Sequence, residues 1–113
     1  MTTTAVRLRQ YNIGSTLVLE VDGDVDVVNI KDFRQSVLCA SDTSNNLVMD
    51  LRKVDYIDRT GLEVIITIYS IRARQGKKLA ILVESHSQPH EISKVVYLHT
   101  LTKVTTKASE VGL

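Results

Sequence analysis

The chain has 113 residues, a length that suits one hydrophobic core and is too short for two. Hydrophobic residues make up 43% of it and charged residues 24%, as in an average folded domain, which argues against a disordered chain. The 14 Lys and Arg residues nearly cancel the 13 Asp and Glu residues, and the formal net charge is +1. This balance provides no broad cationic surface, so neither nucleic acid nor an anionic membrane is expected as a partner.

The single cysteine, Cys39, cannot form an internal disulfide and therefore favours a reducing compartment. No apolar run is long enough for a membrane-spanning helix. Residues 1–4 lack the basic and apolar regions of a secretory signal. We therefore expect a cytoplasmic protein that does not insert directly into a membrane, and we expect Cys39 in its core.

The first part of the chain predicts a hairpin followed by a helix. Residues 6–11 alternate between polar and apolar side chains, and residues 16–21 predict a second strand after a glycine-containing turn. A period of three to four residues then predicts a helix over 27–40, with Asp26 or Asn29 as its N-cap. The apolar face of this helix consists of Ile30, Phe33, Val37 and Leu38.

The rest of the chain alternates between strands and helices. Residues 47–51 form an apolar run that is typical of a strand covered on both faces. Residues 59–75 predict a long helix, and residues 78–83 predict the next strand. A proline opens a last helix over 88–99, and residues 101–106 predict a short edge strand.

This order of elements predicts an α/β fold. A hairpin followed by strand–helix units implies one mixed sheet of four to five strands with helices packed on it. We expect a single domain over residues 1–113, with a core over about 5–106 and a frayed tail at 107–113.

The predicted helix over 59–75 has more apolar surface than contact with one sheet requires. Either neighbouring elements cover the apolar surface that the sheet does not contact, or part of that surface is a docking patch for a protein. The start of the helix offers two N-caps, Asp58 and Thr60, and Thr60 with Glu63 has the spacing of a capping box. Arg59 places a cation at the positive end of the helix, which breaks a local rule and makes it a candidate functional residue.

Several of these segments resemble one family in the right order. Residues 47–62, LVMDLRKVDYIDRTGL, resemble the strand, loop and helix start of the STAS domain of bacterial anti-sigma factor antagonists, which read DL…V…(I/M)DS(S/T)GL. Residues 19–26, LEVDGDVD, are similar to the family's L…GELD. Residues 75–83 and 89–101 match its later strand and last helix, so the resemblance covers nearly the whole chain.

The resemblance implies a non-catalytic regulator that works by partner switching. In this family the unphosphorylated antagonist binds an anti-sigma factor, an ATP-using serine kinase, and so frees a sigma factor. Phosphorylation of the residue after the family's aspartate abolishes binding, and a phosphatase reverses it. A phosphate adds about −1.5 to −2 charges to a docking surface, enough to repel an acidic partner. We therefore expect a signalling role in transcription, with no cofactor, metal or catalytic residue.

The sequence departs from the family at the switch itself. The residue after Asp58 is Arg59, which has no hydroxyl group, and Thr60 is the remaining candidate phosphoacceptor. We favour constitutive binding, in which the Thr60 hydroxyl is engaged at the helix start and Arg59 contacts an acidic partner surface. The resemblance implies that the partner-binding residues are Gly23, Asp24, Asp26, Asp58, Arg59, Thr60, Gly61, Leu62 and Glu63.

Other functional classes fit the sequence less well. Cys39 has no histidine nearby in sequence, and His86 and His90 lack the further ligands of a complete metal site. Asp50 ends a central strand like the acceptor of a phosphoaspartate receiver, but the paired acids that bind Mg²⁺ in receivers are missing. One alternative stays open, a STAS subunit that docks on the ABC-type ATPase of a lipid-transport complex.

Overall fold

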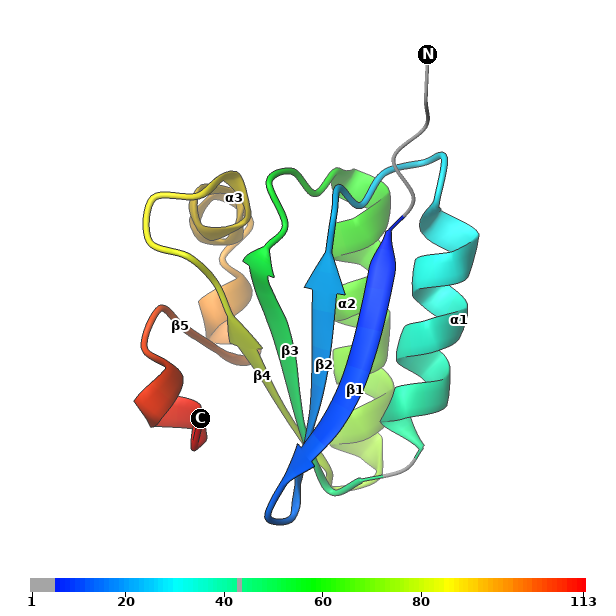
Figure 1. Cartoon of the computed structure of the whole chain (residues 1–113), viewed down its shortest axis with the longest axis vertical. Coiled ribbons are helices and arrows are strands. Elements are labelled where there is room, and N and C mark those ends of the chain that lie inside the picture. Colours follow the sequence, from blue (N-terminus) through cyan, green and yellow to red (C-terminus); the bar gives the residue numbers. More distant parts are fainter. Residues whose placement is uncertain (1–5, 43) are drawn as a thin grey trace.

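The computed structural model describes residues 6–42 and 44–113. In these ranges a five-stranded mixed sheet and three α-helices follow one another in the predicted order (Figure 1). Ala5, where we placed the start of the core, lies outside the described residues. No helix of the described ranges is long and apolar enough to cross a membrane.

The strands of the sheet lie in chain order. At one edge, β1 (Arg7–Ile13) and β2 (Thr16–Asp22) form the predicted antiparallel hairpin. Next to it, β3 (Asn46–Lys53), β4 (Lys78–Leu82) and β5 (Lys103–Thr105) continue the sheet in parallel. Five successive residues of β3 are buried, as expected for a central strand that is covered on both faces.

All three helices pack on the same face of the sheet. α1 (Ile30–Ser41) and α2 (Arg59–Arg74) each connect two parallel neighbours, and such crossovers of one hand place both helices on one side (Figure 1). The short α3 (Gln88–Val95) and a following 3₁₀ turn, η1 (Leu98–Thr100), join the same core through the buried Leu98.

The wide apolar face of α2 is mostly core. Leu62, Val64, Ile65 and Ile68 are buried, whereas Ile66 is 37% exposed. α1 packs beside α2 and covers the surface that the sheet does not reach. The apolar surface of α2 beyond its contact with the sheet therefore packs against α1.

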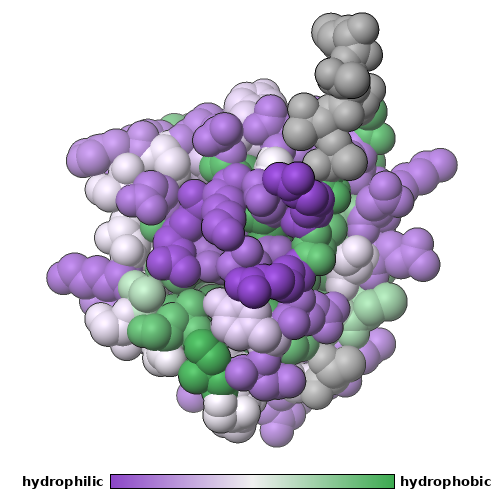
Figure 2. All heavy atoms as spheres, in the orientation of Figure 1, coloured by the Kyte–Doolittle hydropathy of each residue, from purple (hydrophilic) through white to green (hydrophobic). Residues whose placement is uncertain are grey.

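The opposite face of the sheet is open except near β4. There Val18, Val48 and Leu82 form a small apolar cluster, which the C-terminal segment covers. This segment forms a 3₁₀ turn, η2 (Ala108–Val111), instead of the frayed tail that we expected, because its apolar side chains bury themselves on the cluster. Figure 2 shows hydrophilic side chains over most of this face, with apolar ones gathered beside the C-terminal segment. The residues of the C-terminal segment that pack on the cluster are Ala108, Val111 and Leu113.

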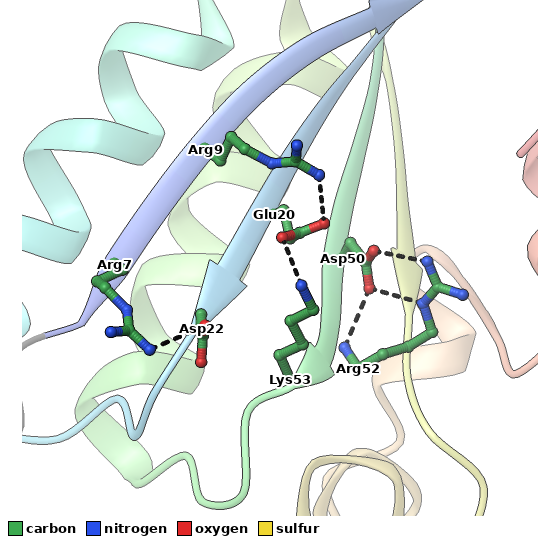
Figure 3. A network of polar contacts seen from close by, with 7 residues as sticks. All are labelled: Arg7, Arg9, Glu20, Asp22, Asp50, Arg52 and Lys53. Atoms are coloured by element: carbon green, nitrogen blue, oxygen red, sulfur yellow. Dashed lines mark hydrogen bonds and ion pairs between the residues drawn. The ribbon is translucent and has the colours of Figure 1, made fainter.

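Charged side chains on β1, β2 and β3 pair with one another across the open face (Figure 3). Each acid drawn there has a cationic partner, so the face presents balanced charge. Asp50 is buried in such a pair, and its carboxylate is already engaged by an arginine. The pairs are Arg7–Asp22 at 3.1 Å, Arg9–Glu20 at 3.1 Å, Lys53–Glu20 at 3.0 Å and Arg52–Asp50 at 2.9 Å.

Helix α1 begins at Ile30, later than the predicted start at residue 27. The Asp26 carboxylate accepts hydrogen bonds from the amides of Val28 at 2.9 Å and Asn29 at 3.4 Å. These bonds hold the backbone in a turn, which competes with the helix for the same amides. Asn29 is the N-cap residue, although its side chain does not cap the helix.

Helix α3 ends at Val95, earlier than the predicted end at residue 99. Val95 is 70% exposed and Val96 41% exposed, because Tyr97 takes a left-handed conformation with φ of 54° and turns the chain away. Leu38 and Cys39 of α1, which we expected in the core, are also exposed.

Arg72, in the last turn of α2, is fully buried. Its guanidinium donates to the carbonyls of Ser41 at 2.7 Å, Ser44 at 3.0 Å and Lys78 at 2.7 Å. One side chain thus ties the end of α1, the following loop and the start of β4 to α2.

Candidate protein-binding site

The loop after β2 and the loop before α2 are joined at the C-terminal ends of the parallel strands, at the top of Figure 1. Val25 and Ile57 form an isolated parallel bridge. The Val25 amide donates to the Tyr56 carbonyl at 2.9 Å, and the Asp58 amide donates to the Val25 carbonyl at 3.0 Å. The two segments that carry the predicted partner-binding residues therefore lie side by side.

Asp58 is the N-cap of α2 and also holds the other loop. Its Oδ1 accepts from the Gly61 amide at 3.2 Å and from the Thr60 hydroxyl at 2.5 Å, while its Oδ2 accepts from the Val27 amide at 3.0 Å. The capping box expected from Thr60 does not form, because Thr60 already lies inside the helix. One carboxylate thus fixes the helix start and the loop that faces it.

Burial raises the pKa of the Asp58 carboxyl, but hydrogen bonds to its charged form outweigh this effect. The Thr60 hydroxyl and the amides of Gly61, Val27 and Thr60 hold the pKa below the ordinary value of 3.8. Asp58 is therefore a carboxylate at neutral pH, and the helix N-terminus favours that charge.

Two glycines of the site are required by the backbone. A Cβ atom on Gly61 would lie 2.6 Å from Ile57 Cγ1 and 2.8 Å from Val25 Cγ1, too close for any other residue without a shift. Gly23 has a φ of 108°, which other residues rarely adopt. Leu62 is buried in the core. These three predicted site residues therefore support the surface through the backbone and the core.

The loop after β2 exposes two valines. Val27 is 68% exposed and Val28 69% exposed, at the tip of a turn that local hydrogen bonds hold. The Asp26 amide donates to Asn29 Oδ1 at 3.0 Å, and Asn29 Nδ2 donates to the Asp24 carbonyl at 2.7 Å. We placed both valines in a helix, although an aspartate and an asparagine three residues apart are typical of such a turn.

The surface around the valines is acidic. Arg59 and Glu63 point into solvent, with their side chains 90% and 61% exposed, and pair with each other at 3.1 Å. Arg59 is therefore already paired within the helix. Asp24, Asp26 and Asp55 lie in the same two loops, so acids outnumber the single arginine there.

A third element supports the site from the side of α3. Gln88 Oε1 accepts from the Ile57 amide at 2.9 Å, and Gln88 Nε2 donates to the Ile57 carbonyl at 3.0 Å. This contact fixes the residue that precedes Asp58. The sequence gives no local signal for Gln88, because the contact joins residues that are far apart in the chain.

His86 and His90 take part in a turn at the start of α3. The His86 amide donates to His90 Nδ1 at 3.2 Å. In residues 6–42 and 44–113, no group of three or more His, Cys, Asp or Glu side chains is placed to hold a metal ion.

Comparison with known proteins identifies the family. The family model described as the STAS domain matches residues 7–109 of the chain. The chain belongs to the STAS domain family. The strand order, the loop after β2 and the start of α2 described above are thus elements of a STAS domain.

Solved structures of STAS proteins share this fold. An anti-sigma factor antagonist from Mycobacterium paratuberculosis superposes with a TM-score of 0.85 at 15% identity, over 94% of this chain and 90% of that one. A putative anti-sigma factor antagonist from Thermotoga maritima gives 0.82 at 18% identity, over 91% and 89%. The phosphorylated form of SpoIIAA, a Bacillus cell fate determinant, gives 0.67 at 11% identity, over 93% and 96%.

Proposed function

We propose that this STAS domain is a non-catalytic regulator that binds a protein partner through the loop after β2 and the start of α2. The observation that carries the proposal is the Asp58 carboxylate, which joins these two segments and leaves Val27 and Val28 exposed beside them. Exposed apolar side chains held rigidly within a polar rim are typical of a protein contact.

The partner that this proposal names is an anti-sigma factor of the ATP-using serine kinase type, in a cytoplasmic partner-switching pathway. The fold shared with anti-sigma factor antagonists supports this assignment. The acids around the valines favour a partner surface with basic residues, rather than the acidic surface that an unpaired Arg59 would suggest.

Binding in this proposal is constitutive. Arg59 offers no hydroxyl group at the position where the family is phosphorylated. The Thr60 hydroxyl donates to Asp58, so a phosphate on Thr60 would lie beside a carboxylate and would lose that hydrogen bond. In this proposal neither position is phosphorylated, so no added phosphate blocks the docking surface.

The test is a calorimetric titration with an anti-sigma factor serine kinase from the same organism, with and without ATP, followed by mass spectrometry. We expect the same affinity in both cases and no added phosphate on Thr60. The Arg59→Ser variant is the positive control, because it restores a hydroxyl group and should become phosphorylated and bind more weakly with ATP. No binding to the kinase, together with binding to an ABC-type ATPase, would replace this proposal by the lipid-transport alternative.

A further inference from the structure

A cavity of about 580 Å³ lies at the end of the sheet opposite the proposed protein-binding site. It occupies a gap at the edge of β4, because β5 pairs only with residues Ala80–Leu82 and leaves Lys78 and Leu79 without a neighbouring strand on that side. The first residues of β2, β3 and β4 reach it. The volume is in the range of sites that hold small molecules, about 300–1,000 Å³.

Part of the cavity lining is apolar. Leu79 lies at its strand edge, Tyr69 and Ala73 of α2 form one wall, and Leu101 lies before β5. Val111 of the C-terminal segment closes the opposite wall. Leu101 is 42% exposed, so part of this apolar surface is in contact with solvent. An apolar tail of a ligand would replace that water.

Most of the charged residues that line the cavity are cationic. Lys77, Lys78 and Lys103 line it, and Glu110 is the one acid among the lining residues. The Glu110 carboxylate already accepts a hydrogen bond from the Thr105 hydroxyl, and the Lys103 ammonium donates to the Glu110 carbonyl at 2.9 Å.

Two of these lysines, Lys77 and Lys78, form no ion pair within the described part of the chain. Both ammonium groups are therefore available to an anionic group at the mouth of the cavity.

We propose that this cavity binds a free, single-chain anionic amphiphile, such as a fatty acid. The carboxylate lies against Lys77 and Lys78, and the alkyl tail lies along Tyr69, Leu79 and Leu101. Charge complementarity selects the head group, and the apolar walls select the tail. A ligand of only one of these two kinds would leave half of the cavity unsatisfied.

The probe for this proposal is dodecanoate below its micelle concentration, added to the ¹⁵N-labelled chain and followed by amide chemical shifts. We expect saturable shifts at Leu79, Leu101 and Val111. Acetate has the head group without the tail, and dodecyltrimethylammonium has the tail with the opposite charge, so neither should produce these shifts. Equal binding of dodecyltrimethylammonium, or dodecanoate shifts that avoid the cavity, would overturn the proposal.

Two variants separate the head group from the tail. Lys77→Glu with Lys78→Glu should weaken dodecanoate binding by roughly tenfold or more, because the rim becomes repulsive. The matched control, Lys31→Glu with Arg34→Glu on the exposed face of α1, should leave it unchanged. Ala73→Trp fills the cavity from the side of α2 and should abolish binding while the chain keeps its circular dichroism spectrum. Unchanged dodecanoate affinity in both cavity variants would contradict the assignment of this site.

Dodecanoate-containing phospholipid vesicles distinguish the free ligand from a membrane. We expect no cosedimentation of the chain with vesicles, because the proposed ligand is a free amphiphile and not a bilayer surface. Cosedimentation that the lysine variant abolishes would instead make this rim a lipid-surface contact and would overturn the proposal. The failure of either experiment leaves the proposed kinase contact untouched, since that contact lies at the other end of the sheet.

Discussion

At the scale of single residues, Asp58 links the stability of the fold to the shape of the proposed binding surface. Its two carboxylate oxygens accept from the helix start and from the Val27 amide of the opposite loop. Hydrogen bonds to a charged acceptor are stronger than those between neutral groups, so this residue contributes more than an ordinary N-cap. Because the pKa of Asp58 is lowered by folding, its contribution depends on pH.

We predict that Asp58→Asn lowers the free energy of unfolding by about 1 kcal/mol at neutral pH, because the amide group cannot accept at both positions. A lowered pKa means that the carboxylate stabilises the fold above its ordinary value of 3.8 and that this stability is lost as the pH falls through the folded pKa. Urea unfolding of both proteins should therefore show a difference that shrinks in acid. The control is Asp55→Asn, an exposed acid in the same loop. An equal loss in both variants would show that local charge alone, and not the cap, is responsible.

The roles of Asp58 and Gly61 in the site can be predicted from the sequence. Those of Val27, Val28 and Gln88 cannot. Short-range spacing at a helix start leaves a local pattern, and the resemblance of residues 47–62 to a known family adds to it. The valines look like helix residues until the turn at Asp26 is known. Gln88 acts on a peptide unit 31 residues away, and such a pairing has no sequence signature.

At the scale of elements, Arg72 joins three segments of the fold to α2. Its guanidinium fork supplies donors to carbonyls at the end of α1, in the next loop and at the start of β4. Burial lowers the pKa of this arginine, which shows that removing the charge from water is unfavourable in itself. The hydrogen bonds to the three carbonyls compensate for that burial.

We predict that Arg72→Met lowers the free energy of unfolding by about 2–4 kcal/mol, because buried carbonyls lose their donors while the volume is nearly conserved. Arg74→Met is the matched control. It removes an exposed arginine of the same helix turn, which donates to the Ser70 carbonyl at 3.4 Å, and should change stability by less than about 0.5 kcal/mol. Urea unfolding measures both. Similar stabilities for the two variants would refute the role of Arg72 as a clamp.

The order and type of the elements follow from periodicity, but their ends do not. The hairpin, the three helices and the parallel strands are confirmed because each carries several residues with one clear period. The start of α1 and the end of α3 were wrong because a side chain at Asp26 and a left-handed Tyr97 redirect the backbone over a single residue. The burial of Arg72 could not be predicted, because its sequence position gives no sign of the carbonyls that surround it.

At the scale of the whole molecule, the charges are sorted along the strands. The acids near the exposed valines lie at one end of the sheet, and the lysines of the cavity lie at the other. Between these two ends, acidic and cationic side chains on the open face pair with one another (Figure 3). Hydrogen bonds from Lys53 and Arg9 keep the pKa of Glu20 low. The net charge of +1 is therefore the sum over surfaces of opposite sign.

The measurement that tests the proposed surface most directly is the affinity of Val28→Ser for the isolated anti-sigma factor kinase, compared with that of Ile13→Ser. Both replace an exposed aliphatic residue by serine, but Ile13 lies in the β1–β2 hairpin at the opposite end of the sheet. The account predicts a roughly tenfold loss of affinity for Val28→Ser, from the lost apolar contact, and none for Ile13→Ser. Wild-type affinity in Val28→Ser, or an equal loss in both variants, would contradict it.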